Sequence, residues 1–113
     1  MQFLVIGKDG SDDDALERRM AVRKAHMQLG DEMELAGNQW YGAVILDGNR
    51  KMIGSMAVMD FPSEKELHEW LAKEPYVTGN VWKTVEVMQC NVRNPWKFNR
   101  PKEFFEERRS NQP

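Results

Sequence analysis

Three side chains able to bind an anion or transfer a proton recur at helical spacing in one segment of the sequence. Arg19, Arg23 and His26 lie three or four residues apart, so on a helix they are neighbours on one surface. Two guanidinium groups present several fixed hydrogen-bond donors, which suit a carboxylate, enolate or phenolate. The imidazole is the only one of the three groups that changes protonation near neutral pH. The three residues therefore predict a site for a small anionic or oxygen-rich molecule.

The segment that carries these residues has the periodicity of an amphipathic helix. On a helical wheel the three cationic or titratable side chains fall between two apolar stripes and are predicted to face the core. A cation in an apolar arc is costly unless it is paired or lines a cavity, which favours a functional site. A structural interpretation stays open, because long Arg side chains often reach the surface along apolar neighbours. The predicted stripes are Ala15, Val22, Leu29 and Met33, and Leu16, Met20 and Met27.

The elements that would position this helix follow the order β-α-β-β-α-β. Ser11 with Asp14, and Ser63 with Glu66, match the capping-box pattern that begins a helix, and a turn at 47–49 joins the middle strands as a hairpin. This order predicts an α+β, ferredoxin-like fold in which a four-stranded antiparallel sheet carries two helices on one face. Strands are expected at about 2–7, 40–46, 52–59 and 81–89, and helices from about 12 to the mid-thirties, ending at Gly37-Asn38, and from 63 to about 73.

Apolar side chains occupy both sides of the two middle strands. In the first of them, Val44 and Leu46 alternate with Ala43 and Ile45 on the opposite side. A sheet with one solvated face alternates apolar with polar residues, and this strand does not. Because both helices cover one face only, a second copy of the chain is the simplest cover for the other face. The pattern therefore predicts a homodimer that pairs sheet against sheet.

Composition restricts the class of protein. The chain has 113 residues, a formal net charge of −2 and one cysteine, so we expect one domain, no general affinity for nucleic acid and no intrachain disulfide. No apolar run approaches the roughly 20 residues that span a bilayer, no signal-peptide core begins the chain, and no Cys/His cluster has the spacing of metal ligands. A cytoplasmic protein that binds neither membrane nor metal is the expectation.

The basic C-terminal segment is expected to lie outside the domain. Residues 93–113 carry six Lys or Arg against three Asp or Glu and include several aromatic residues. We divide the chain into a domain of residues 1–91 and a tail of residues 92–113. The tail is predicted to pack on the partner subunit, and docking on another protein is the alternative.

Three segments resemble the motifs of one known family. Residues 19–26 are similar to the Arg-x-x-x-Arg-x-x-His segment on the first helix of YciI-like (YCII-related) proteins. Gly54-Ser55 followed by Phe61 resembles the Gly-Ser strand of this family, and residues 70–77 resemble its segment ending in Asp-Pro-Tyr. The resemblance covers roughly residues 2–90, and the order and spacing of the three segments carry it.

The resemblance implies a dimeric α+β barrel and a site in which the helix His pairs with the acid of the Asp-Pro-Tyr segment. Carried over, the catalytic pair is His26 and Glu74. Glutamate replaces the family's aspartate, and one added methylene moves the carboxylate by about 1.5 Å. The helix-to-strand loop also departs from the family, since residues 36–38 lack its usual Gly-Pro. The residues expected to bind substrate are Arg19, Arg23, Ser55 and Tyr76.

The implied chemistry is proton transfer of the isomerase or lyase type on a small oxygenated or anionic substrate, with His26 as general acid/base and no cofactor. Some YciI-like proteins are associated with dehydrochlorination of chlorinated hydroxyquinones, which belongs to the same chemistry. A non-catalytic module that binds a metabolite or a protein stays open as the alternative. Glu74 meeting His26 in an enclosed cavity would favour catalysis, whereas arginines facing a shallow groove would favour binding.

Overall fold

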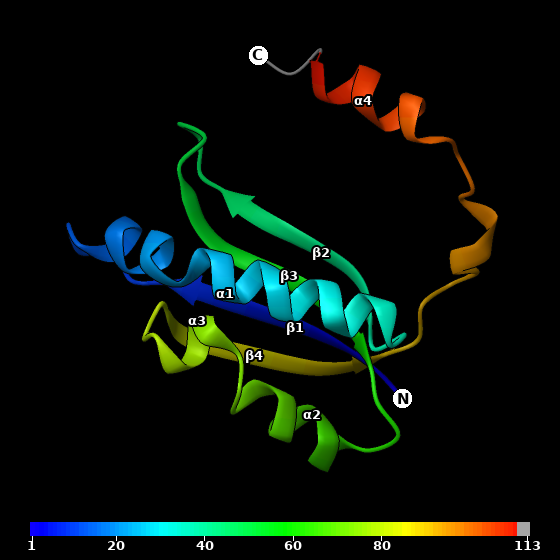
Figure 1. Cartoon of the computed structure of the whole chain (residues 1–113), viewed down its shortest axis with the longest axis horizontal. Helices are drawn as coiled ribbons and strands as arrows, with labels where there is room; N and C mark the ends of the chain where they lie inside the picture. Colours follow the sequence, from blue (N-terminus) through cyan, green and yellow to red (C-terminus); the bar gives the residue numbers. More distant parts are fainter. Residues whose placement is uncertain (111–113) are drawn as a thin grey trace.

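The computed structural model describes residues 1–110. Its elements follow the predicted order, with one short helix added before the last strand and a 3-10 turn and a further helix added after it (Figure 1). No helix in this described part is both long and apolar enough to span a membrane. The elements are β1 (Gln2–Asp9), α1 (Ala15–Leu35), β2 (Gln39–Leu46), β3 (Met52–Asp60), α2 (Glu64–Leu71), α3 (Pro75–Thr78), β4 (Trp82–Cys90), the 3-10 turn η1 (Pro95–Lys97) and α4 (Lys102–Ser110).

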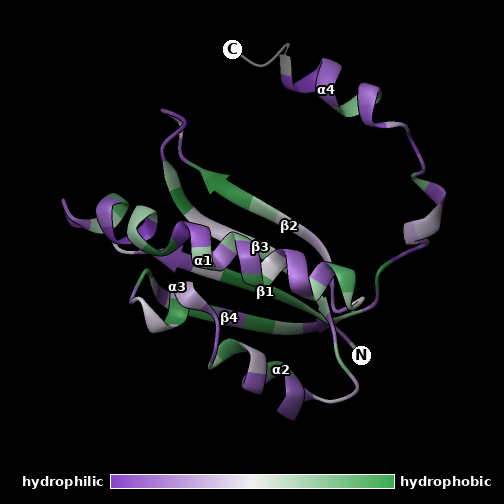
Figure 2. Ribbon diagram, in the orientation of Figure 1, coloured by the Kyte–Doolittle hydropathy of each residue, from purple (hydrophilic) through white to green (hydrophobic). Residues whose placement is uncertain are grey.

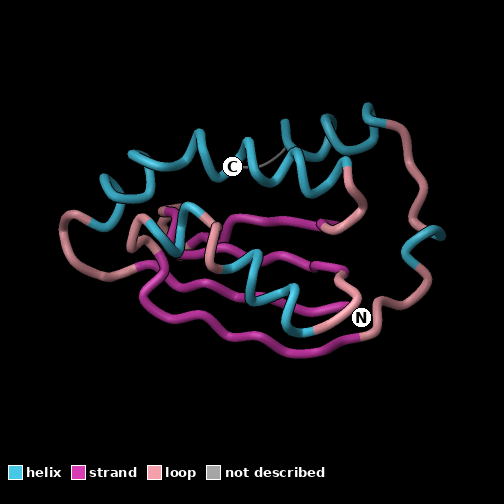
Figure 3. Tube along the Cα trace, turned by 60° about the horizontal axis from the view of Figure 1, so that its bottom comes forward, coloured by secondary structure: helices cyan, strands magenta, loops and turns pink. Residues whose placement is uncertain are grey.

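The four strands form one antiparallel sheet in the order β2-β3-β1-β4. The long helix α1 and the α2–α3 segment lie on the same face of this sheet (Figures 1 and 3). Strand order and helix placement are those of the ferredoxin-like split β-α-β arrangement. The predicted α+β fold class is therefore confirmed.

The core lies between the sheet and these helices. Phe3 and Val5 point from β1 towards the helices, and Phe3 pairs with Met59 of β3, so that alternate residues of the central strands are buried. Leu67 and Trp70 of α2 pack against them from the other side. These core contacts hold α2 against the sheet, and the chain then turns towards α1 at residues 72–75.

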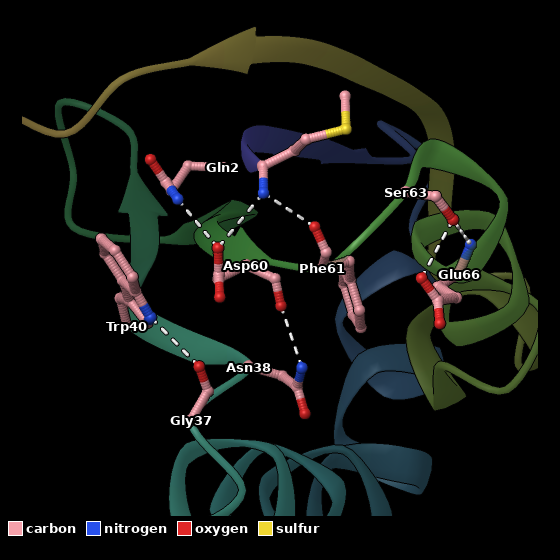
Figure 4. A network of polar contacts seen from close by, with 9 residues as sticks. Gln2, Gly37, Asn38, Trp40, Asp60, Phe61, Ser63 and Glu66 are labelled. Atoms are coloured by element: carbon pink, nitrogen blue, oxygen red, sulfur yellow. Dashed lines mark hydrogen bonds and ion pairs between the residues drawn. The ribbon is translucent and has the colours of Figure 1, made fainter.

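The second helical segment breaks in two at a proline. The Ser63 hydroxyl accepts from the Glu66 amide at 3.4 Å, so the predicted N-cap is confirmed (Figure 4). The Glu66 carboxylate accepts from the Ser63 hydroxyl at 2.9 Å, in place of the backbone amide that it would bind in a capping box. The segment α2 ends at Leu71, and Glu74 is extended (φ −63°, ψ 120°), as expected before Pro75. The short helix α3 that follows was not predicted, because a single turn has too few residues to show a periodicity.

Asp60 joins the ends of three segments at one edge of the fold (Figure 4). Its carboxylate accepts from Gln2 Nε2 at 2.8 Å, and its backbone carbonyl accepts from Asn38 Nδ2 at 2.9 Å. Asn38 follows Gly37, whose φ of 84° is the left-handed conformation that commonly ends a helix. The predicted stop of α1 at this point is confirmed.

Only one of the two predicted apolar stripes of α1 is buried. Leu16, Met20 and Met27 are 39–51% exposed, so the core-facing arc is not centred between the two stripes as predicted. A helix lying on a sheet buries a single arc, and this arc is centred on the other stripe. The predicted capping box at Ser11 is also absent, since Asp14 is the N-cap residue and its side chain makes no cap hydrogen bond. The buried or partly buried arc holds Ala15, Arg19, Val22, His26, Leu29 and Met33.

No helix of residues 1–110 covers the opposite face of the sheet (Figure 3), and hydrophobic residues run along its strands (Figure 2). Leu4 points to this face, and its partners across the sheet are Val58 and Met88. Tyr41, which also pairs with Val58, is 45% exposed, and Met88 is 44% exposed. The expectation of apolar residues on both faces is confirmed, while the homodimer stays a prediction.

The C-terminal arm, residues 92–110, stands away from the sheet on the side of β2 (Figure 1). Phe98, Phe104 and Phe105 contact one another edge to face, with ring centroids 5.3–6.0 Å apart. The Arg108 guanidinium lies 3.4 Å from the centre of the Phe104 ring, and Trp96 is largely exposed. The arm thus forms an aromatic cluster of its own, and its packing on a partner subunit stays a prediction.

Candidate functional site

His26 and Glu74 meet on the helix-covered face of the sheet. His26 lies in the middle of α1, and Glu74 is the N-cap residue of α3. The imidazole Nδ1 pairs with the Glu74 carboxylate, which is almost fully buried. The same carboxylate oxygen accepts from the Tyr76 amide at 3.1 Å. A carboxylate accepts hydrogen bonds, so this contact suits an Nδ1–H donor and leaves Nε2 directed away from Glu74.

The imidazole of His26 is accessible on one side. Its side chain is 24% exposed, against 2% for the Glu74 side chain. Nε2 has no hydrogen-bond partner within the described chain. A base that is held at one nitrogen and open at the other is able to exchange a proton with a bound molecule.

An aromatic cluster holds the imidazole in place. The Tyr76 ring stacks on His26 with centroids 3.8 Å apart and planes inclined by 13°. Trp82 approaches both rings edge-on, at 6.2 Å from His26 and 5.7 Å from Tyr76. Burial raises the pKa of the Tyr76 phenol, so this ring stays neutral at physiological pH. The sequence predicts a hydroxyl contact to substrate from Tyr76, whereas the structure places its ring beneath the imidazole.

Arg19 is fully buried in a polar network of its own. Its Nη1 donates to both carboxylate oxygens of Asp9 at 3.0 Å, and its Nη2 donates to the Ser55 hydroxyl at 2.8 Å. Arg19 is 3% exposed and the Asp9 side chain 2%. A buried guanidinium needs such partners to offset its desolvation. Two of the residues expected to bind substrate, Arg19 and Ser55, are thus bound to each other in the free protein.

Asp9 is the residue that sequence reasoning missed. It sits in a Lys-Asp-Gly stretch after the first strand, which has the composition of a turn. The available signal was the unpaired cation in the apolar arc of the helix, since a buried arginine requires an acid nearby. Spacing alone does not say which of the many acids supplies it.

Arg23 lies on the exposed flank of α1, contrary to the prediction that it faces the core. On a helix its position is rotated by about 60° from that of His26, towards the exposed stripe that contains Met27. Among the described residues, no hydrogen bond or ion pair occupies its guanidinium. Of the two predicted arginines, Arg23 is therefore the one free to meet a ligand.

Surface depressions of about 420 and 430 Å³ lie near the N-terminal end of α1, and neither is lined by His26 or Glu74. The larger is lined by residues of the β1–α1 turn and the β2–β3 hairpin, including Asp9, Lys8 and Lys51. The described residues contain no cluster of His, Cys, Asp and Glu side chains that could hold a metal ion. A single chain thus presents His26 at its surface and not inside one of these depressions.

Comparison with known proteins places the chain in a family. The sequence model of the YCII-related domain matches residues 1–96, which is most of the chain. A solved structure with the same fold is the 5-chloro-2-hydroxyhydroquinone dehydrochlorinase of Burkholderia phenoliruptrix, in complex with 2,5-dihydroxybenzoquinone. It superposes with a TM-score of 0.71 at 20% sequence identity, covering 80% of this chain and 94% of the other. No functionally curated protein matches the sequence. The protein belongs to the family of YCII-related domains.

Proposed function

We propose that this YCII-related domain is a small-molecule enzyme in which His26 transfers a proton as general acid/base. The observation that carries the proposal is an imidazole whose Nδ1 pairs with the buried Glu74 and whose other side is accessible. The carboxylate fixes the tautomer, and the Tyr76 ring fixes the orientation of the imidazole plane. A side chain positioned in this way contributes a rate factor of about 10²–10⁴.

In the proposed reaction, neutral His26 takes a proton through Nε2 from a carbon beside a carbonyl group or from a hydroxyl group of the substrate. The electron pair left behind forms an enolate or phenolate, which the exposed Arg23 guanidinium binds. The imidazolium then returns its proton to another atom and completes an isomerisation. Alternatively, the electron pair expels a leaving group such as chloride, and the imidazolium gives its proton to solvent, which completes an elimination and regenerates the base. Neither route consumes an oxidant or a reductant.

The fold supports a catalytic role on small molecules. The domain matches the architecture of a dehydrochlorinase that is named for a hydroxylated, chlorinated ring. Loss of hydrogen chloride is an elimination that begins with removal of a proton, which is the step proposed for His26. Hydroxylated and chlorinated rings are therefore the first substrates to test.

A non-catalytic binding module is the second candidate function. It is favoured because, of the two arginines predicted to bind substrate, only Arg23 is exposed, and because the two depressions lie away from His26. In this alternative Arg23 captures a metabolite at the surface, and the His26–Glu74 pair stabilises the fold. The C-terminal arm, with its exposed Trp96, would then serve a protein partner.

We also propose that the chain acts as a homodimer, paired through the uncovered face of the sheet. Tyr41 and Met88 on that face are nearly half exposed in the single chain, and a face of this kind is typical of an interaction surface. The arm packs on the partner subunit in this proposal, because its aromatic residues find little cover on their own domain. An even oligomer of higher order would use the same face.

The test uses 5-chloro-2-hydroxyhydroquinone and its chlorine-free analogue, with release of chloride and uptake of solvent deuterium as readouts. We expect His26→Asn to lower the rate by about 10²–10⁴-fold. The control is His68→Asn, since His68 is exposed on α2 beside Glu64. Turnover that survives His26→Asn would contradict the acid/base role. Binding without turnover in a thermal-shift assay, lost in Arg23→Ala, would favour the binding module.

A further inference from the structure

The ring of Tyr76 contacts the side chains of both Arg19 and His26. The Arg19 guanidinium carbon is 4.6 Å from the ring centre, and the imidazole centre is 3.8 Å from it. Two groups this close to the centre of one ring are too bulky to share a single face. Their positions on α1 are seven residues apart, so two helical turns, about 10.5 Å, separate their backbones and leave room for one ring plane. The three side chains form a stack of guanidinium, phenol and imidazole.

The guanidinium end of this stack is fixed from behind. Arg19 donates to both carboxylate oxygens of Asp9 and to the Ser55 hydroxyl, so β1 and β3 hold its planar fork in one orientation. Both side chains of the ion pair are at least nine-tenths buried. A flat cation held over a ring restricts the tilt of that ring, since the attraction depends on the cation lying over its face.

We infer that Arg19 is a positioning residue, which sets the orientation of the Tyr76 ring and through it the plane of the His26 imidazole. The inference rests on the proposed function and assigns to Arg19 a role other than binding substrate. Glu74 fixes one nitrogen of the imidazole, but a single hydrogen bond leaves the ring free to rotate about that contact. The stack removes this freedom, which keeps Nε2 directed to one place.

The charged and titratable groups around the stack come from three elements. Arg19 and Arg23 belong to α1, Glu74 and Tyr76 belong to the turn that begins α3, and Asp9 ends β1. The Arg19–Asp9 pair is neutral as a unit, so its effect on His26 is expected to come from geometry more than from net charge. A substitution that keeps the positive charge but removes the planar fork isolates this effect.

The experiment compares Arg19→Lys with Arg18→Lys by proton NMR of the histidine ring signals in the free protein. Lysine keeps the charge opposite Asp9 but lacks the flat surface that stacks on a ring. Arg18 is the matched control, because it pairs with Asp12 at the surface. Because the His26 ring stacks on Tyr76, the ring current is expected to shift its protons upfield, whereas exposed His68 supplies an internal reference. We expect Arg19→Lys to move the His26 signals downfield, most of the way to His68, and Arg18→Lys to leave them in place.

Two further variants keep the outcome unambiguous. Tyr76→Phe retains the ring and is expected to retain the upfield shift, and Tyr76→Leu is expected to abolish it. A lower melting temperature of Arg19→Lys with unchanged His26 signals would assign Arg19 a structural role only and overturn the inference. Because the readout requires no substrate, it is independent of the turnover assay. Turnover that fails while the signals move would refute the proposed function and leave the positioning role of Arg19.

Discussion

The Glu74 carboxylate binds the His26 imidazole across 48 residues of sequence. Glu74 is able to do so because it is also a cap: its carboxylate accepts the Tyr76 amide at the start of α3 and is thereby held in one rotamer. Pro75 contributes as well, since it keeps the preceding residue extended and directs its side chain back towards α1. The acid of the pair is therefore part of a rigid turn and not of a mobile loop.

Replacing Glu74 with glutamine tests how much the His26–Glu74 pair contributes to the stability of the fold. Glutamine has nearly the same volume and still accepts from the Tyr76 amide, but it loses the charge that pairs with His26. We expect Glu74→Gln to lower the free energy of unfolding by about 1–3 kcal/mol, measured by urea denaturation. Glu69→Gln is the control, because Glu69 is exposed on α2. Equal stability of the two variants would show that the pair contributes nothing to folding.

Because Arg19 and Asp9 form a buried ion pair, we expect substitutions at the two positions to have strongly non-additive effects on the free energy of unfolding. Arg19→Met leaves the Asp9 carboxylate buried without its cation and is expected to lower the free energy of unfolding by about 3–5 kcal/mol. The double variant Arg19→Met, Asp9→Asn removes the stranded charge and should recover more than half of this loss. A double-mutant cycle in urea measures the coupling. The control is Arg18→Met, at the surface, which is expected to change the midpoint of urea unfolding little. Additive effects of the substitutions at Arg19 and Asp9 would contradict the prediction.

The raised pKa of Tyr76 predicts a loss of stability at alkaline pH. Burial raises the pKa of this phenol, and the positive charges of Arg19 and Arg23 oppose the rise only in part. The unfolded chain ionises near pH 10, whereas the folded state resists ionisation. The free energy of unfolding is therefore unaffected by this group below pH 10 and falls as the pH rises from there towards the folded pKa.

The comparison of wild type with Tyr76→Phe isolates that group, because both chains share every other titration. The stability difference between them should be constant up to about pH 10 and then change in favour of Tyr76→Phe. Tyr41→Phe is the control, since Tyr41 is nearly half exposed on the open face of the sheet. A difference that stays constant through the alkaline range would contradict the assignment.

The lack of a side chain at Gly7 lets the Trp82 indole pack directly against the backbone of β1. A Cβ atom at position 7 would lie 2.2 Å from Cδ2 of the indole, so Gly7→Ala must displace the ring that borders His26 and Tyr76. We expect a loss of about 1–3 kcal/mol and a shift of the tryptophan fluorescence. Gly48→Ala is the control, because nothing lies within 4 Å of a Cβ there. Equal melting temperatures of the two variants would show that the indole moves without cost.

The uncovered sheet face predicts which substitutions abolish the dimer. Met88→Glu places a charge in the centre of the proposed interface, where desolvation makes it unfavourable, and is expected to give monomers in sedimentation at micromolar concentration. Met20→Glu is the control, because Met20 is similarly exposed but lies on α1, on the other side of the sheet. A wild-type protein that sediments as a monomer would contradict the proposed pairing, as would a Met88→Glu variant that still dimerises.

The sequence alone determined the features that depend on local chain geometry. The order of strands and helices, the end of α1 at Gly37 and the cap at Ser63 follow from periodicity, positive φ and hydrogen bonding within a few residues. The apolar pattern on both sides of the middle strands is also local, since it needs only the alternation of a strand. The pairing of His26 with Glu74 came from the resemblance to a family and not from spacing, which is uninformative across 48 residues.

Only the tertiary structure decided which arc of α1 is buried and what its cations do. Two apolar stripes with three cationic or titratable residues between them fit several rotations of the helix about its axis. The rotation is set by contacts with Asp9 and Ser55 on the sheet and with Tyr76 in α3, which bury Arg19 and leave Arg23 exposed. These contacts join residues far apart in sequence, and their energies depend on distance and burial, which no local pattern encodes.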